Sequence, residues 1–556
     1  MKLLTKLTAI LSFNVLAAQQ MPTQLNETHP SFTYSECTAD GNCKKYIKSL
    51  VLDSNWRWTD VDGINCYTGT EWNETYCSDP DTCAKKCSLE GGDYENTYGI
   101  TTPSDNQVRL AFSTYDSSSN LTSIGSRLYM LDDSNTYKKF YLKNQEFAFD
   151  VDISTLGCGL NGALYLVEMD ADGDVGQNYN SAGAQLGTGY CDSQCPHDLK
   201  FINGEANLLD WTPIPNSSNS GDGRYGTCCF ELDIWEANAR ATQMTPHTCT
   251  IQGQYRCENE TECGDIDAGE RNNGVCDKNG CDFNPSRLGF DSFFGNGSEY
   301  SVDTSRPFTV VTQFITSDNT TNGDLVEMRR FYVQDNQVIK NIAVDFGTGN
   351  SHDSITDAFC TEKTDAFADA GDVSSFADRG GMKAMGQAMD RGLVLVMSLW
   401  DDYEVAMIWL DAQDPPEKEY ANISGAHRGP CSVDSGKPWV VEVEQADAYV
   451  TFGDVRVGDI GFTMASLNLD DDNDDSSGIT HCSTDLDCKD AANSKDTICV
   501  VASDNSWDQC ISCDPIQFQY ECPYFQGSFK STAEATCGLT CDSLSRKDSA
   551  PASSIM

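Results

Sequence analysis

The sequence predicts an all-β protein, an antiparallel β-sandwich with long loops and few, short helices. Many short runs rich in β-branched and aromatic residues alternate with segments rich in Gly, Asn, Asp and Ser. Strands separated in this way by turn-forming residues are typical of β-sandwiches. The clearest expected strands are residues 107–113, 147–153, 163–169, 308–316, 393–399 and 448–455.

The chain begins with a segment that predicts secretion. Lys2 and Lys6 precede an apolar stretch from Leu7 to Leu16, and Ala17-Ala18 follows. This pattern is that of a cleaved signal peptide over residues 1–18, which is too short to span a membrane. Since no later segment is long and apolar enough to span one, we expect a secreted, extracellular protein without a membrane partner.

The cysteine content agrees with an oxidising compartment. The 26 cysteines are an even number in a chain with eight Asn-x-Ser/Thr glycosylation acceptors, and we interpret them as disulfides. Six histidines and no Cys-x-x-Cys pattern with paired histidines argue against a metal site, so we expect neither metal nor cofactor. A formal charge of −48 argues against nucleic acid, because phosphate would be repelled. Nothing in the sequence demands more than a monomer.

One stretch places three carboxylates inside an apolar run. Residues 228–249 read CCFELDIWEANARATQMTPHTC. Side chains along a strand alternate between faces, so Glu231 and Asp233 point the same way and Glu236 points the other way unless one extra residue is inserted. A β-bulge between Asp233 and Glu236 would bring all three acids to one face.

With the bulge, the two glutamates are about 13 Å apart along the strand, at roughly 3.3 Å per residue. Two long side chains that lean together could bring their carboxyls to about 5 to 5.5 Å, the separation used by retaining glycosidases. Three like charges this close raise at least one pKa, as a general acid requires. The alternative is a solvated acidic strand edge, and spacing alone does not decide between the two.

The run E-L-D-I-W-E-A-N, preceded by Cys-Cys and followed by T-P-H-T-C, resembles the active-site signature of glycoside hydrolase family 7, the cellobiohydrolases and endoglucanases that cut β-1,4-glucan. The similarity covers about residues 28–461. It implies that Glu231 is the nucleophile, Glu236 the acid/base and Asp233 the residue that tunes the nucleophile. For His247 it implies a nearby polar partner, with a hydrogen-bonded structural histidine as the alternative.

The resemblance also implies a concanavalin A-like β-jelly roll whose long loops form a groove or tunnel for cellulose or another β-1,4-glucan. Such a chain needs aromatic platforms for its sugar faces and polar groups for its hydroxyls. The matching positions are Trp56, Trp58, Trp400 and Trp409 as platforms, Asn161, Tyr165, Tyr190, Asp192 and Gln194 near the cut, and Arg271 and Arg428 on the product side. For any single tryptophan the alternative is core packing. Asp267, Asn272 and Asn279 depart from the family pattern on the product side.

Among the 18 cysteines from Cys37 to Cys431, the resemblance implies nine bridges. They include Cys37–Cys43, Cys77–Cys83, Cys158–Cys431, Cys195–Cys228 and Cys191–Cys229.

Loop lengths favour an exo-acting enzyme. Residues 211–228 and 263–276 have the length seen in tunnel-forming cellobiohydrolases, whereas endoglucanases look shortened there. The loop after Trp58 is somewhat short, which suggests a more open entrance. We therefore expect a processive cellobiohydrolase that releases cellobiose from reducing ends, with an endo-β-1,4-glucanase of the same family as the alternative.

Three more distant alternatives remain. One is an enzyme for mixed-linkage or β-1,3-glucans, against which the flanking cysteines and the four matched tryptophans argue. The second is a catalytically inactive glucan-binding protein, against which the presence of all three carboxylates argues. The third is a wall-expanding or structural role, which predicts binding without release of sugar.

Beyond the catalytic domain, expected over residues 19–465, the composition changes. Residues 466–480 are predicted to be an acidic linker. Residues 481–542 hold eight cysteines, and so short a unit needs disulfides because it cannot bury a sufficient core. Its aromatic residues would suit adsorption to cellulose, with a structural or protein-binding appendage as the alternative. A disordered tail is expected over residues 543–556.

Overall fold

The computed structural model describes residues 27–117, 121–217, 220–373 and 375–467, together with the backbone of two later strands. The chain forms two compact units that divide between residues 468 and 469. In the second unit, β32 (Thr497–Val501) and β33 (Asp508–Ser512) pair as an antiparallel hairpin. The predicted signal peptide, most of the linker, the rest of the Cys-rich module and the tail lie outside the described residues.

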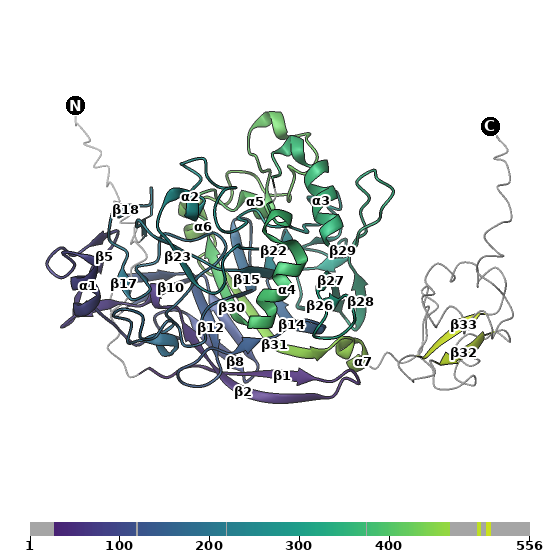
Figure 1. Cartoon of the computed structure of the whole chain (residues 1–556), viewed down its shortest axis with the longest axis horizontal. Coiled ribbons are helices and arrows are strands. Elements are labelled where there is room, and N and C mark those ends of the chain that lie inside the picture. The colour runs from purple at the N-terminus through teal and green to yellow at the C-terminus, as the bar shows by residue number, and fades with distance from the viewer. Residues whose placement is uncertain are drawn as a thin grey trace, which may run out of the picture. The chain divides into compact units, whose positions relative to one another are not determined.

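One 16-stranded sheet dominates the first unit (Figure 1). Its main path runs β22-β21-β15-β30-β12-β2-β1-β31-β14-β26-β27-β28, and β8, β9, β13 and β29 attach to it. Neighbouring strands on this path are antiparallel except β1 and β31, which are parallel. The bounds are β1 (Ser31–Cys37), β2 (Cys43–Leu52), β8 (Ile100–Ser104), β9 (Gln107–Ala111), β12 (Ser126–Leu131), β13 (Lys139–Phe140), β14 (Gln145–Asp152), β15 (Leu160–Val167), β21 (Glu231–Ala237), β22 (Thr242–His247), β26 (Phe308–Thr316), β27 (Leu325–Gln334), β28 (Gln337–Lys340), β29 (Ser354–Ile355), β30 (Leu393–Asp401) and β31 (Tyr449–Asp459).

The two halves of this sheet pack face to face around the core. Trp235 of β21 is fully buried, and its ring centroid lies 6.1 Å from that of Phe149 on β14 and 5.7 Å from that of Phe308 on β26. The other face of β15 and β30 carries a second buried cluster that includes Val167 and Val396. The predicted β-jelly-roll sandwich is thus confirmed, and each of the six strand ranges expected from the sequence overlaps an observed strand.

The helices of the described residues are short, from 4 to 11 residues. Gly386 lets α4 pack closely on β27, since an added Cβ would lie 2.8 Å from Cβ of Leu325. The bounds are α1 (Pro80–Lys86), α2 (Glu260–Cys263), α3 (Asp357–Ala366), α4 (Gly381–Arg391), α5 (Ile408–Asp411), α6 (Pro438–Glu444) and α7 (Phe462–Ser466). Within the part of the chain described, no helix has the length and apolar character needed to cross a membrane.

Short accessory strands shape the loops. They form separate small sheets of two or three strands. The bounds are β3 (Thr59–Val61), β4 (Ile64–Asn65), β5 (Tyr67–Thr68), β6 (Glu71–Trp72), β7 (Ser88–Leu89), β10 (Ser113–Asp116), β11 (Leu121–Ile124), β16 (Phe201–Ile202), β17 (Glu205–Ala206), β18 (Thr212–Pro213), β19 (Gly221–Asp222), β20 (Gly226–Cys228), β23 (Tyr255–Cys257), β24 (Phe294–Gly295) and β25 (Val302–Asp303).

Nine disulfides pair all 18 cysteines of the described part of the first unit. The five predicted bridges are all present. Two of them, Cys191–Cys229 and Cys195–Cys228, tie the loop around residue 193 to the residues just before β21. Because cross-links restrict the chain, this loop is fixed beside the start of that strand.

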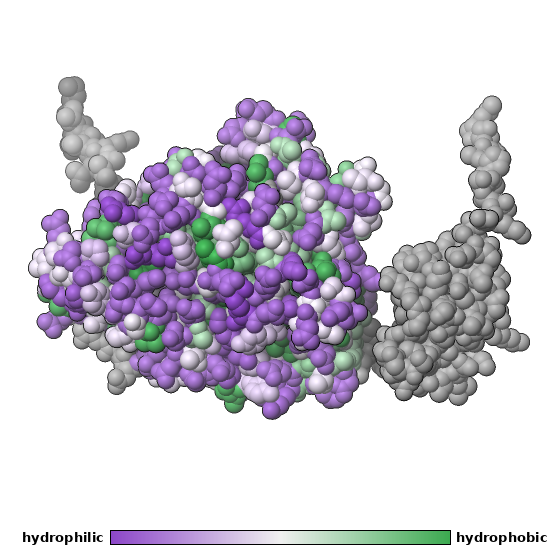
Figure 2. Space-filling view, viewed as in Figure 1, coloured by the Kyte–Doolittle hydropathy of each residue, from purple (hydrophilic) through white to green (hydrophobic). Residues whose placement is uncertain are grey.

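The surface in Figure 2 is mainly hydrophilic, with hydrophobic residues in small separate groups. Some carboxyl groups of this acidic chain are nevertheless buried. Burial, followed by the charge of Asp170, raises the pKa of Asp174 to about 7. Burial likewise raises the pKa of Asp222 to about 7 and that of Asp411 to about 6. These groups bind protons more tightly in the folded than in the unfolded chain, so their stabilising contribution is complete below about pH 4 and is lost as the pH rises through 6 to 7.

We therefore expect the melting temperature to fall between pH 5 and pH 8. An Asp174→Asn variant should show a smaller fall, because the amide does not ionise and asparagine also tolerates the left-handed backbone at this position, where φ is 62°. Differential scanning calorimetry at both pH values measures the change. Asp335→Asn, at an exposed position with φ of 55°, is the matched control and should behave as wild type. Equal falls in wild type and Asp174→Asn would contradict the prediction.

Candidate active site

A cavity of about 1550 Å³ lies on the face of β21, β15 and β30 that points away from the core. It is larger than the roughly 300–1000 Å³ of typical small-ligand sites. Its lining contains 18 Asp or Glu side chains against 7 Lys or Arg. The size and charge of this cavity suit an extended neutral ligand and disfavour a polyanion.

The cavity face of β21 carries all three predicted acids. The β21–β22 register shifts between Asp233 and Glu236, so the predicted β-bulge is confirmed. Glu231, Asp233 and Glu236 line the cavity, while Ile234 and Trp235 both belong to the core. The extra residue thus places Glu236 on the cavity face of β21, whereas strict alternation would place it on the core face.

Two buried side chains bind backbone groups at the bulge. Asn161 of β15 accepts a hydrogen bond of 3.1 Å from the Ala237 N–H. Arg330 of β27, in the opposite layer, donates to the Ile234 carbonyl, and its Nε donates to Thr312 Oγ1 at 3.2 Å. A buried backbone group left without a partner costs about 1–3 kcal/mol. Both side chains therefore stabilise the bulge.

Glu236 is held by two amide side chains. Asn161 Nδ2 donates to its Oε1 at 3.0 Å, and Gln243 Nε2 donates to its Oε2 at 2.9 Å. Burial raises the pKa of Glu236, and the bond from Gln243 partly offsets that rise. A carboxyl that is fixed in place and keeps its proton to higher pH has the properties of a general acid.

Glu231 is held by the disulfide-tied loop. The Ser193 N–H and Oγ–H both donate to Glu231 Oε2, at 3.1 and 2.6 Å. Burial raises the pKa of Glu231 well above its usual range, and the charge of Asp233 adds to the rise. The bonds from Ser193 favour the ionised form, the form in which a carboxylate attacks.

Asp233 lies against His247. His247 Nε2 is 3.0 Å from Asp233 Oδ2, and its Nδ1 is 2.8 Å from the Asp277 carbonyl. The carbonyl can only accept, so Nδ1 carries a hydrogen and one further proton must lie between Nε2 and the carboxylate. Burial, followed by the charge of Glu236, raises the pKa of Asp233 well above its usual range. A proton is thus retained between Asp233 and His247.

The same three side chains also have metal-ligand atoms. One carboxylate oxygen of Glu231, one of Asp233 and one ring nitrogen of His247 lie within 4.8 Å of one another. Both nitrogens of His247 already have partners, however, and one oxygen of Glu231 accepts two bonds. We therefore interpret the group as a proton-sharing cluster.

Ten of the twelve expected substrate-binding residues line the cavity. They are Trp56, Tyr165, Tyr190, Asp192, Gln194, His247, Arg271, Trp400, Trp409 and Arg428. Trp400 and Trp409 stack with 6.1 Å between ring centroids. Asn161 instead lies beneath Glu236. Trp58 is half-buried and is not among the lining residues of this cavity.

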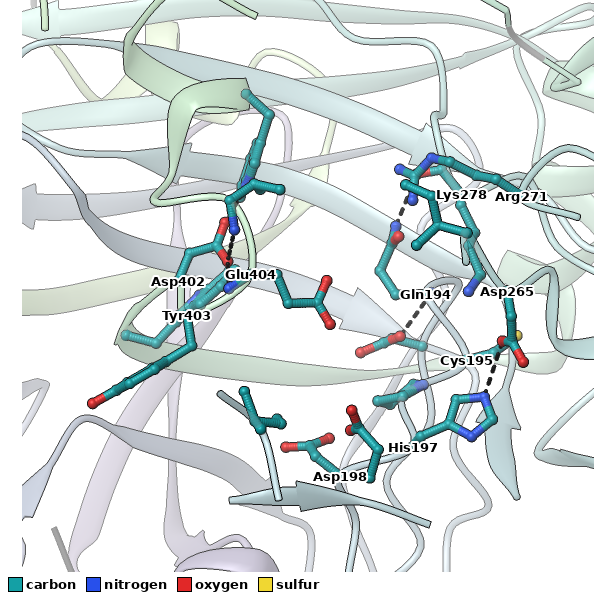
Figure 3. A pocket seen from close by; sticks show the side chains of 18 of the residues that line it. Gln194, Cys195, His197, Asp198, Asp265, Arg271, Lys278, Asp402, Tyr403 and Glu404 are labelled. Atoms are coloured by element: carbon teal, nitrogen blue, oxygen red, sulfur yellow. Dashed lines mark hydrogen bonds and ion pairs between the residues drawn. The ribbon is translucent and has the colours of Figure 1, made fainter. Parts of the chain in front are cut away.

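The predicted roof segments, residues 211–228 and 263–276, both contribute lining residues. Figure 3 shows Arg271 and Lys278 on one side of the cavity and Glu404 extending from the other side. Arg271 Nε donates to Asn279 Oδ1 at 2.8 Å. Asn279, which departs from the family pattern, therefore accepts a hydrogen bond from this arginine.

Sequence reasoning missed two residues that contact the acids, Ser193 and Gln243. Ser193 stands between the two neighbours that were singled out, so only its bond to Glu231 distinguishes it. Gln243 could have been found by folding the hairpin back across residues 238–241, where Asn238 accepts bonds from the Arg240 and Ala241 N–H groups. That turn places Gln243 opposite Glu236.

Comparisons with known proteins agree with this geometry. A family model described as Glycosyl hydrolase family 7 matches residues 21–464. The crystal structure of a GH7 family cellobiohydrolase from Daphnia pulex is 49% identical over 79% of this chain and 98% of that chain, with a TM-score of 0.76. A cellobiohydrolase from Melanocarpus albomyces complexed with cellotetraose is 41% identical over 79% and 98%, with a TM-score of 0.72. The endocellulase EGI of Humicola insolens is 35% identical over 80% and 99%, with a TM-score of 0.65. The family resemblance is confirmed.

We expect Arg330→Met to lower the free energy of unfolding by about 1–3 kcal/mol, because the Ile234 carbonyl loses its donor. Urea denaturation followed by tryptophan fluorescence measures this change. Arg329→Met is the matched control, because Arg329 is the neighbour of Arg330 on β27 but is exposed and pairs with Glu327. This variant should change stability by less than about 0.5 kcal/mol. Equal stability of Arg330→Met and wild type would show that the bulge does not need this bond.

Proposed function

The chain belongs to glycosyl hydrolase family 7 and is a cellulase of that family, and from this premise we propose that it is a secreted cellobiohydrolase. It hydrolyses β-1,4-glucosidic bonds of cellulose with retention of configuration and releases cellobiose processively from reducing ends. The observation that carries the proposal is the bulged strand β21, which presents Glu231, Asp233 and Glu236 together in a long acidic cavity.

In the first step Glu231 attacks the anomeric carbon while Glu236 gives its proton to the departing glycosidic oxygen. One bond forms, one breaks, and the leaving chain departs as an alcohol. The bonds from Ser193 support the ionised form of Glu231. Burial supports the protonated form of Glu236, which is the form that a general acid needs in this step.

In the second step Glu236, now a carboxylate, takes a proton from water. The oxygen of this water attacks the anomeric carbon of the glycosyl–Glu231 ester from the side that the leaving group vacated. This second displacement restores the original configuration. Asp233 and His247 share a proton beside Glu231. They moderate the charge on the nucleophile as it is consumed and regenerated.

The aromatic lining supports binding of a glucan chain. Trp56, Trp400 and Trp409 line the cavity, and flat apolar indole rings match the apolar faces of pyranose sugars. Because a neutral glucan carries no charge, the acidic lining does not repel it.

The exo mode is supported by the comparisons and by the loops. The cellobiohydrolases are 49% and 41% identical to this chain, whereas the endocellulase is 35% identical. Residues of both predicted roof segments border the cavity. An endo-β-1,4-glucanase of the same family is the second candidate, favoured by the position of Trp58 outside the lining set. The nine disulfides support secretion into an oxidising compartment.

We expect the purified protein to release mainly cellobiose from amorphous and crystalline cellulose. Glu231→Gln should lose at least about a thousandfold of this activity, because an amide cannot replace the nucleophile. Glu327→Gln, at a partly exposed position of β27 that does not line the cavity, should keep full activity. Chromatography that resolves the soluble sugars by chain length measures the products.

Two results would contradict this proposal. A spread of oligosaccharides with a rapid fall in the viscosity of soluble glucan would indicate an endoglucanase. Tight adsorption to cellulose without release of any sugar would indicate a glucan-binding protein.

We expect Asp233→Asn to move the acidic limb of the kcat/KM profile to lower pH. The charge of Asp233 contributes to the raised pKa of Glu231, and activity is lost as the pH falls through the pKa of a nucleophile that must be ionised. Initial rates on a soluble aryl cellobioside between pH 3 and pH 8 measure the limb. Asp335→Asn serves as the control. An acidic limb that stays in place or moves to higher pH would contradict the assigned role.

A further inference from the structure

Gln243 occupies a position between Glu236 and the open cavity. It stands opposite Glu236 in the β21–β22 register, is 6% exposed and lines the cavity. Its Nε2 donates to Glu236 Oε2 at 2.9 Å. Its Oε1 is buried and has no hydrogen-bond partner among the described residues. One end of this amide is therefore used, and the other is a buried acceptor without a donor.

The orientation of the amide follows from chemistry. An ionised carboxylate can only accept hydrogen bonds, so the NH2 group of Gln243 must face Glu236 whenever Glu236 is ionised. That orientation leaves the carbonyl oxygen without a donor, which is unfavourable for a buried acceptor. Since Gln243 borders the cavity, a hydroxyl of a bound ligand can donate a hydrogen bond to this carbonyl oxygen.

The order of the strands places Gln243 on the leaving-group side. Trp400 lies on β30, the acids lie on β21, and Gln243 lies on β22 at the far end of the path β30-β15-β21-β22. Beyond β22, Met244 bridges to Phe283. Next to Phe283 is Asp282, which lies 3.8 Å from the predicted product-side residue Arg428. A glucan chain that crosses the strands from Trp400 to Arg428 therefore passes Gln243 after the cleaved bond.

We propose that Gln243 is a positioning residue that couples recognition of the leaving sugar to proton donation. Its carbonyl oxygen accepts a hydrogen bond from a hydroxyl of the glucose unit on the leaving-group side. Its NH2 group donates to Glu236 and orients that carboxyl toward the glycosidic oxygen. The inference rests on the proposed function, because it takes Glu236 as the acid. Under this proposal the side chain of Gln243 contacts both the departing sugar and the acid Glu236.

The bond from Gln243 also influences when Glu236 loses its proton. It favours the ionised form and so partly offsets the rise in pKa that burial causes. Loss of this bond raises the pKa of Glu236, and an acid that keeps its proton longer remains active to higher pH. A variant without the amide should therefore show its alkaline limb at higher pH than wild type.

The test compares two substrates in a Gln243→Met variant, which keeps the volume and removes both polar groups. Cellotetraose has a sugar leaving group, which needs both the hydroxyl contact and the proton. 2,4-Dinitrophenyl β-cellobioside has a leaving group that needs neither. We expect kcat/KM on cellotetraose to fall roughly 10- to 100-fold, kcat/KM on the aryl cellobioside to stay within about twofold, and the alkaline limb on cellotetraose to move to higher pH.

Gln313→Met is the matched control. Gln313 Nε2 donates to Glu146 Oε2 at 2.7 Å, in a buried amide–carboxylate pair on β26 and β14 that does not line the cavity. Removing this bond tests whether loss of any such pair affects the two substrates differently. We expect the ratio of the two kcat/KM values to equal that of wild type, whatever the change in melting temperature.

The outcomes separate this inference from the proposed function. An equal loss on both substrates, or no loss on cellotetraose, would overturn the role of Gln243 while the cellulase remains. Failure of wild type to release cellobiose from either substrate would overturn the proposed function, and this inference with it. Because activity on the aryl cellobioside also reports correct folding, the ratio of the two kcat/KM values is compared with that of wild type. An unchanged ratio counts against the role of Gln243 whatever the melting temperature of the variant.

Discussion

The one-residue bulge between Asp233 and Glu236 is the constraint on which the site depends. Without it, Glu236 would point into the core and Trp235 toward the cavity. The cost of the disrupted ladder is offset by Asn161 and Arg330, which bind backbone groups on either side of the extra residue. Asn161 also bonds Glu236, so one side chain both supports the bulge and orients the acid.

The second physical theme is the burial of acids close to one another. Desolvation raises the pKa of all three carboxyls on β21, and specific donors then distinguish them. Ser193 donates to Glu231, and His247 lies within hydrogen-bond distance of Asp233. The amides of Asn161 and Gln243 donate to Glu236. Chemically identical groups thereby acquire different hydrogen-bond partners within one cavity. The disulfides that fix residue 193 extend this control from the sheet to a loop.

Much of this arrangement could be predicted from the sequence, because periodicity and turn residues determine which strands form and the alternation of acids required a bulge. The partners of those acids could not. Gln243 and Ser193 are unremarkable in sequence, and their importance depends on the hairpin register and on where a cross-linked loop lies. For Trp58 the family position indicated a sugar platform, but this residue is not among the lining residues of the cavity. Whether an aromatic ring borders a cavity depends on the loops around it. The five disulfide pairings that were predicted came from resemblance, since spacing alone leaves many connectivities open.

The stereochemistry of the first product tests the central claim most directly. Proton NMR of the cellobiose formed from an aryl β-cellobioside in the first minutes, before mutarotation, reports the anomer formed at the cleaved bond, because cellobiose is the glycosyl part of this substrate. If Glu231 forms a covalent glycosyl intermediate and Glu236 returns water from the same side, β-cellobiose appears first and the α-anomer grows in later. Initial appearance of the α-anomer would show inversion and would contradict the roles assigned to these two carboxylates.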